Sequence, residues 1–144
     1  MPIITPADLG TNIYPEIITE ITRADDTIAA RAIATAIQEA KLYLGKYDLL
    51  QLFGNDSTPA TLSDELLNSL VRDIACWHLL RLSNPALDHA TYRTAYTDAV
   101  TTLKSIMNGQ ARPDGWPYAA PGDAPLPETD AIGWNSNPRR ENHY

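Results

Sequence analysis

The chain has 144 residues, 44% of them hydrophobic and 20% charged, and a formal net charge of −7 at pH 7. This length holds one domain with a modest core plus an appendage. The acidic balance excludes the basic surface that supplies most nucleic-acid affinity, and charges interrupt every apolar run that could span a bilayer. Residues 1–6 lack the features of a signal peptide, so we expect a protein made in the cytoplasm and no membrane association.

Two short helices are expected at the start of the chain. Pro6 follows Thr5, a capping residue, and Pro15 precedes Glu16. Proline is favoured in the first turn of a helix, where its missing N–H is no loss, and an acid there interacts well with the helix dipole. Both positions therefore predict helix starts.

A long helix is predicted to begin after Asp25 and Asp26 and to end near Gly45. Its apolar residues recur at helical spacing, namely Ile28, Ile33, Ile37, Ala40 and Leu44. The stretch 46–54 is apolar without helical periodicity, so we expect an irregular or short extended piece there. Residues 55–59 have the composition of a loop.

Two more helices complete the expected bundle. The first should start near Thr61 or Ser63 and end at Asn84 and Pro85. Its wide apolar face comprises Leu66, Leu67, Leu70, Val71, Ile74, Ala75, Trp77, His78 and Leu79. The second should start at Asp88 and end at Gly109. Its apolar side comprises Tyr92, Ala95, Tyr96, Ala99, Val100, Leu103, Ile106 and Met107.

The predicted fold class is therefore all-α. Three main helices and short N-terminal helices form a small bundle over residues 1–109, and a Pro-rich arm follows over residues 110–144. The arm holds six of the eleven prolines, which remove backbone donors and favour extended structure. Because the apolar stripes lie before residue 109, we expect the helical part to fold without the arm.

The arm also carries the predicted partner or oligomer interface. Aromatic and arginine side chains are enriched at interfaces, and an extended segment cannot bury its own rings locally. The predicted interface residues are Trp116, Tyr118, Trp134, Arg139, Arg140 and Tyr144. The alternative is that the arm's rings pack on the chain's own helices.

Little in the sequence predicts catalysis. The histidines His78, His89 and His143 are scattered, so neither a metal site nor a cofactor is expected. Cys76 lies in a helical stretch and is expected to be a buried apolar residue. Asp73 interrupts an apolar face, which fits either a surface carboxylate or a structural hydrogen bond. We expect the protein not to be an enzyme.

Three local patterns occur in order along the helical part. They are residues 37–49 (IQEAKLYLGKYDL), residues 70–79 (LVRDIACWHL) and residues 92–109 (YRTAYTDAVTTLKSIMNG). Together they resemble the head–tail connector proteins of Mu-like phages and prophages, also called adaptor or head-completion proteins. The resemblance covers residues 5–109.

This resemblance implies a structural protein located in the virion, at the head–tail interface. It implies a ring, commonly dodecameric in the family, that joins the capsid portal to neck and tail-completion proteins. DNA would pass through the ring without binding tightly. The competing hypothesis is a small acidic helical regulatory or inhibitory module that binds its target through the C-terminal tail.

Overall fold

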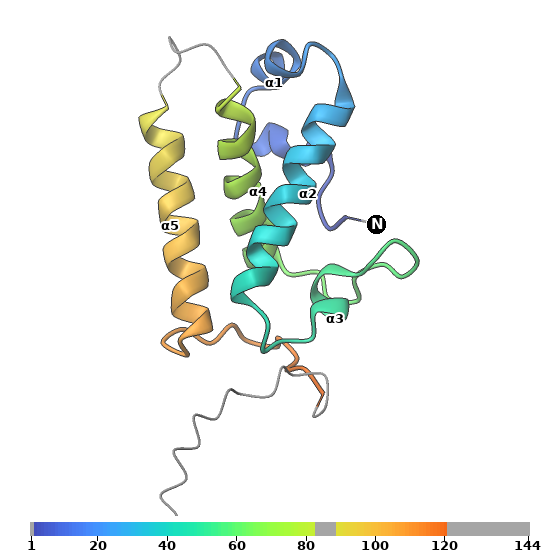
Figure 1. Cartoon of the computed structure of the whole chain (residues 1–144), viewed down its shortest axis with the longest axis vertical. Helices are drawn as coiled ribbons and strands as arrows, with labels where there is room; N and C mark the ends of the chain where they lie inside the picture. Colours follow the sequence, from blue (N-terminus) through green and yellow to red (C-terminus); the bar gives the residue numbers. More distant parts are fainter. Residues whose placement is uncertain (1, 83–88, 121–144) are drawn as a thin grey trace, which may run out of the picture.

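The computed structural model describes residues 2–82 and 89–120, in which every regular element is a helix (Figure 1). The elements are η1 (Pro6–Thr11, a 3-10 helix), α1 (Pro15–Thr22), α2 (Asp26–Tyr43), α3 (Leu49–Phe53), α4 (Glu65–Leu80) and α5 (Ala90–Met107). The prediction of an all-α bundle with three main helices and short N-terminal helices is confirmed. None of the described helices is long and apolar enough to cross a lipid bilayer.

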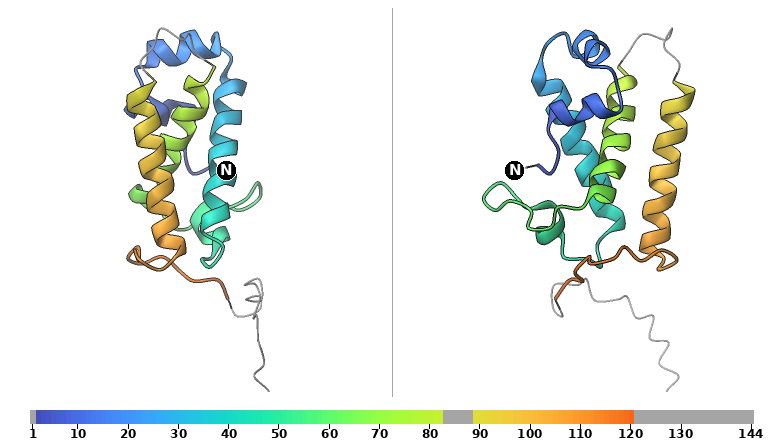
Figure 2. Two further views of the ribbon diagram at one scale, coloured as in Figure 1. Left: turned by 60° about the vertical axis from the view of Figure 1, so that its left-hand side comes forward. Right: turned by 180° about the vertical axis from the view of Figure 1, so that it is seen from behind.

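The three long helices stand side by side, and α4 packs against both α2 and α5 (Figure 1; Figure 2). Since α2 and α5 run in the same direction, both end at the lower end of the body in Figure 1, which we call the base. The two N-terminal helices η1 and α1 lie toward the opposite end (Figure 2). The chain after α5 crosses beneath the base.

Carboxylate caps begin three of the helices. Asp25 accepts a 2.9 Å hydrogen bond from the Thr27 N–H at the start of α2, and Asp64 accepts one of the same length from the Leu67 N–H in α4. Asp48 does the same for α3. Each cap satisfies an N–H group that the helix leaves unpaired in its first turn.

Two segments differ from the sequence-based expectation. Residues 46–54 were expected to be irregular or extended, but they contain the short helix α3. Asp48 caps this helix, which is too short to show helical periodicity in the sequence. Helix α4 begins at Glu65, after the expected start at Thr61 or Ser63, and ends at Leu80. The expected breaks at Asn84, Pro85 and Asp88 lie outside the described residues.

One hydrophobic core joins all three long helices. It includes alanines of α2 that let the helix axes approach closely, and the larger aliphatic side chains of α4. The buried residues of α2 and α4 are Ala29, Ala32, Ile33, Ala36, Ile37, Ala40, Leu67, Leu70, Val71, Ile74, Ala75, Cys76, Leu79 and Leu80. Helix α5 buries only Ala99, Leu103 and Ile106. Met107 and Leu66, both expected on apolar faces, are exposed.

Gly54 ends α3 with φ 67° and has almost no space around its Cα. A Cβ atom there would lie 2.5 Å from the Ala60 nitrogen and 2.6 Å from the Thr58 oxygen. Both are backbone atoms, so no side-chain movement could relieve the clash. The loop that connects α3 to α4 therefore requires glycine at this position.

Candidate interaction site at the base of the helical body

The segment after α5 folds back onto the base. Gly109 adopts φ 77° and Gly115 adopts φ 75°, which turns the chain twice. The Asp48 N–H then donates a 2.9 Å hydrogen bond to the Pro117 carbonyl, and the Ala119 N–H donates a 3.0 Å bond to the Lys46 carbonyl. Two main-chain hydrogen bonds thus attach the start of the predicted arm to the body.

Three aromatic rings pack together at this attachment. Tyr47 meets Trp116 edge-on, with ring centroids 5.4 Å apart, and stacks on Tyr118 at 5.2 Å. The Lys46 ammonium lies 5.5 Å from the centre of the Tyr47 ring. Such pairs contribute about 0.5–1.5 kcal/mol each beyond the area they bury. The cluster therefore holds residues 116–118 against the body.

Trp116 and Tyr118, both predicted to contact a neighbour, have different surroundings. Trp116 is 5% exposed and belongs to the core of its own chain, which contradicts the expectation that another chain buries it. Trp116 lies outside any helix, so no helical periodicity in the sequence could assign it to the core. Tyr118 is 61% exposed and covers Tyr47 with one face only.

Two buried donors in this cluster have no acceptor among residues 2–82 and 89–120. They are the Tyr47 hydroxyl and the Trp116 indole N–H. Burial raises the pKa of the Tyr47 phenol, and the neighbouring Tyr118 adds to the rise. A buried donor without an acceptor lowers the free energy of unfolding by about 1–3 kcal/mol, so these two unpaired donors weaken the packing at the base.

Three exposed apolar side chains lie on elements that meet at the base. Leu50 of α3, Met107 at the end of α5 and Tyr118 are all exposed. Leu50 lines one cavity with Ala119, and the Lys46 ammonium lies 3.4 Å from the Met107 carbonyl. We call Leu50, Met107 and Tyr118 the apolar rim of the base.

A separate cluster of polar side chains, which the sequence did not predict, joins the three long helices. One Glu39 carboxylate oxygen lies 2.9 Å from His78 Nε2, and the other accepts a 2.6 Å hydrogen bond from the Tyr96 hydroxyl. Trp77 stacks on Tyr96 beside them. The hydrogen bond to Glu39, followed by burial, raises the pKa of Tyr96 to about 12. Tyr96 therefore stays a hydrogen-bond donor throughout the physiological range.

This cluster is suited to holding helices together. Glu39 and His78 are both mostly buried, and each oxygen of the Glu39 carboxylate has a hydrogen-bond partner. Cys76, on α4 near His78, is buried, and burial raises its pKa to about 12, so at neutral pH it is a thiol and a poor nucleophile. The expectation of a buried Cys76 is confirmed. Residues 2–82 and 89–120 contain no group of acids, histidines and cysteine that could hold a metal ion.

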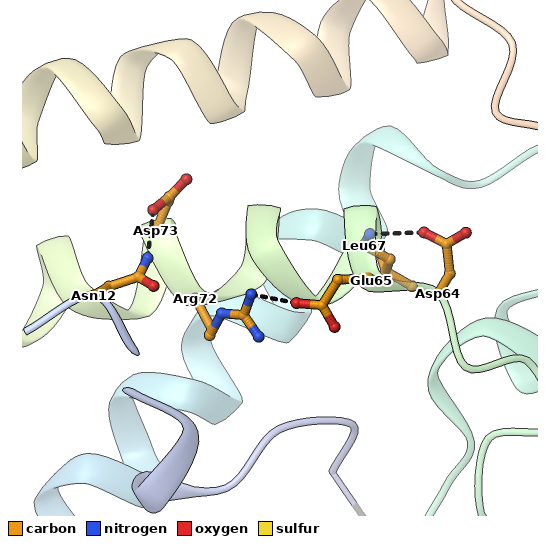
Figure 3. A network of polar contacts seen from close by, with 6 residues as sticks. All are labelled: Asn12, Asp64, Glu65, Leu67, Arg72 and Asp73. Carbon is orange, nitrogen blue, oxygen red and sulfur yellow. Dashed lines mark hydrogen bonds and ion pairs between the residues drawn. The ribbon is translucent and has the colours of Figure 1, made fainter. Parts of the chain in front are cut away.

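Asp73 makes a structural hydrogen bond, one of the two roles left open by the sequence. Its carboxylate accepts a 2.7 Å bond from the Asn12 side-chain amide and so attaches α4 to the end of η1 (Figure 3). Burial raises the pKa of Asp73 despite that bond. On the same helix Arg72 pairs with Glu65, seven residues and about two helical turns earlier (Figure 3).

The remaining predicted interface residues, Trp134, Arg139, Arg140 and Tyr144, lie outside the described residues, as does His143. The described geometry therefore concerns only the first part of the arm, up to Ala120. A scan against protein-family models, a search of curated proteins and a search of solved structures each gave no significant match to the chain.

Proposed function

We propose that this chain is a structural head–tail connector of a tailed bacteriophage. Copies of it would form a ring that joins the capsid portal to the neck and tail and surrounds the path of the DNA. The proposal starts from the three sequence motifs that resemble the Mu-like connector family. The structural observation that supports it most is the base, where a C-terminal segment attached to the body lies beside an exposed apolar rim.

The rim has the chemistry of a protein contact. Leu50, Met107 and Tyr118 present apolar surface to solvent, and Tyr118 is the kind of large amphipathic side chain that anchors interfaces. The Tyr47 hydroxyl and Trp116 indole lie just beneath and lack acceptors among the described residues. A partner that covers the rim would bury its apolar surface, and it could pair the two buried donors only if the aromatic cluster also rearranged.

The charge of the chain fits a wall beside DNA. Residues 1–109 carry a net charge of −5 and residues 110–144 carry −2. A surface of this sign repels phosphate, so DNA could pass during packaging and ejection without sticking. The same charge would be unfavourable for a protein whose task is to grip DNA.

The test is assembly of particles in the phage or prophage that encodes the chain. Deleting its gene should leave DNA-filled heads that are not joined to tails, as seen by electron microscopy. Adding the purified protein to the extract should restore joined particles. Normal particles in the deletion strain would contradict the connector role and favour the regulatory module.

Surface variants separate assembly from folding. Leu50→Asp and Tyr118→Ala alter the apolar rim and should abolish joining while leaving the helical circular dichroism unchanged. Tyr14→Ala is the matched control, because Tyr14 is also an exposed tyrosine but lies between η1 and α1, away from the base. Equal loss of joining in all three variants would show that the rim is not the contact.

A further inference from the structure

A groove lies along α2, between the N-terminal residues and the loop after α3. Its cavity volume is about 280 Å³, and Ile33, Ile37 and Phe53 form its apolar floor. Ala30 and Ala34 of α2 line it with small, exposed side chains. The floor residues themselves are largely buried, and Ile37 keeps 8% of its surface exposed. Pro2, Ile4 and Pro6 close the side opposite the loop.

The described chain ends close to this groove. Ala119 and Ala120 line a neighbouring cavity with Leu50, whereas Phe53 lines the groove. Leu50 and Phe53 both belong to α3, a helix of five residues, and a helix of that length is only about 7 Å long. The chain therefore leaves the described part within one short helix of the groove.

The sequence that follows suits an apolar groove. Residues 121–131 read PGDAPLPETDA, and Leu126, between two prolines, is their only large aliphatic residue. Proline-rich segments bind apolar grooves that contain an aromatic ring, since their extended backbone loses little entropy on binding. At about 3.1 Å per residue, the six residues from Ala120 to Leu126 span about 19 Å, which is enough to pass α3.

We propose that residues 121–131 bind in this groove of the same chain, with Leu126 against Ala30, Ala34 and the exposed edge of Ile37. The short connection from Ala120 gives the segment a high effective concentration at its own groove. Gln38 and Lys41 line the edge of the groove, and their side chains can donate hydrogen bonds to the carbonyl groups of an extended segment. Lys41 also attracts the three acidic residues of the segment, whereas Asp56, on the loop side of the groove, repels them.

The segment's proposed position does not depend on the connector function. A chain of either proposed class, connector or regulatory module, would store the first part of its tail on its own body until a partner competes for it. The proposal concerns the isolated full-length protein and is tested there.

The first test traps the contact with a disulfide in the full-length chain. Ala34→Cys with Leu126→Cys should form an intrachain bond rapidly under mild oxidation, seen by non-reducing electrophoresis and mass spectrometry. Thr101→Cys with Leu126→Cys is the control, because Thr101 is exposed on α5, across α4 from the groove. The native Cys76 is buried and should not interfere.

Two outcomes of the trapping test would overturn the proposal. Disulfide-linked dimers as the main product would place the segment in the groove of a second copy. Trapping at Ala34 no faster than at Thr101 would show that the segment does not occupy the groove.

A second test leaves the groove itself unaltered. Leu126→Asp should shift the methyl resonances of Ala30 and Ala34, because a charged side chain cannot stay on the apolar floor. Leu126→Ile, which keeps the apolar volume, should leave these resonances near their wild-type positions. Unshifted Ala30 and Ala34 resonances in Leu126→Asp would contradict the proposal even if the disulfide forms.

Discussion

The Tyr96 hydroxyl donates a hydrogen bond of 2.6 Å to Glu39, a residue 57 positions earlier in the chain. Because His78 lies 2.9 Å from the other oxygen of the same carboxylate, Glu39 connects α2 to both α4 and α5. Helix α5 buries few apolar residues, so this polar contact carries a larger share of its attachment than a similar bond would on α4.

We expect Tyr96→Phe to lower the free energy of unfolding by about 1–2 kcal/mol, because a hydrogen bond to a charged group contributes about 1.5–3 kcal/mol and this one is partly exposed to solvent. Urea unfolding followed by circular dichroism measures this change. Tyr14→Phe, at an exposed hydroxyl, should have no effect. The raised pKa of Tyr96 means that its stabilising effect is complete below pH 10 and is lost as the pH rises through about 12. Equal stability of wild type and Tyr96→Phe at pH 7 would contradict this role.

The second prediction concerns where the arm can be cut. Truncation after Ala120 should lower the melting temperature only slightly, since it removes the segment proposed to bind the α2 groove but leaves the core intact. Truncation after Gly109 should destabilise the body by about 3 kcal/mol, since it removes the buried Trp116. Trp116→Ala in the full chain should cost a similar amount. Differential scanning calorimetry of the three variants checks this. A shorter fragment as stable as the longer one would restore the original expectation that the core ends before Gly109.

The third prediction concerns pH and Asp73. Burial raises the pKa of Asp73 above its ordinary value of 3.8, so the folded state holds the proton more tightly than the unfolded state. The resulting stabilisation is complete below pH 3.8 and is lost as the pH rises through the folded-state pKa. The stability of wild type relative to Asp73→Asn should therefore increase between pH 7 and pH 3.

Comparing wild type with Asp73→Asn separates the effect of Asp73 from that of other carboxylates, whose pKa values are lowered in the folded state. Hydrogen bonds from Thr5 lower the pKa of Asp8, and hydrogen bonds from Thr27 lower that of Asp25, so both lose stabilisation in acid. Those effects are shared by wild type and Asp73→Asn and cancel in the difference. A stability of wild type relative to Asp73→Asn that falls toward pH 3 would reverse the sign we assign to Asp73.

The fourth prediction uses Cys76 as a reporter. Its thiol is buried with a pKa of about 12, so a thiol reagent at pH 8 should label the native protein only as fast as the body opens. Labelling should become immediate in denaturant. Thr101→Cys, at an exposed position on α5, provides the control for a thiol that reacts without opening. Native Cys76 that reacts as fast as this control would contradict its placement in the core.

The fifth prediction concerns DNA. With a net charge of −7, the full-length protein should not retain duplex DNA in an anisotropy titration at physiological salt. Micromolar binding that weakens as salt rises would indicate a basic surface and would make Lys41, Lys46, Arg72 and Arg81 the first residues to neutralise.

The sequence predicted those parts of the fold that have a local signal. Capping aspartates such as Asp25 and periodic apolar residues such as Ile33 and Ile37 locate helices from within a few neighbouring residues. Gly109, expected to end the last helix, does so with a left-handed backbone. These features depend on short-range chemistry, which a single sequence displays directly.

The interaction site could not be predicted in the same way. Tyr47 and Trp116 are 69 positions apart, and no periodic pattern relates two residues that meet through a turn and a crossing segment. The Glu39, His78 and Tyr96 cluster is similarly spread over three helices. Their polar side chains fit either solvent or one another until the packing of the helices is known.

The space around Gly54 has a consequence for recognising relatives of this chain. Substitutions on exposed faces can accumulate without altering the backbone, so overall identity can fall far while the body persists. At Gly54 any other residue would collide with the backbone at Thr58 and Ala60 and force a different loop between α3 and α4. A distant chain that keeps a glycine there, six residues after an aspartate that caps the preceding short helix, would share a local geometry that chance similarity of helices does not provide.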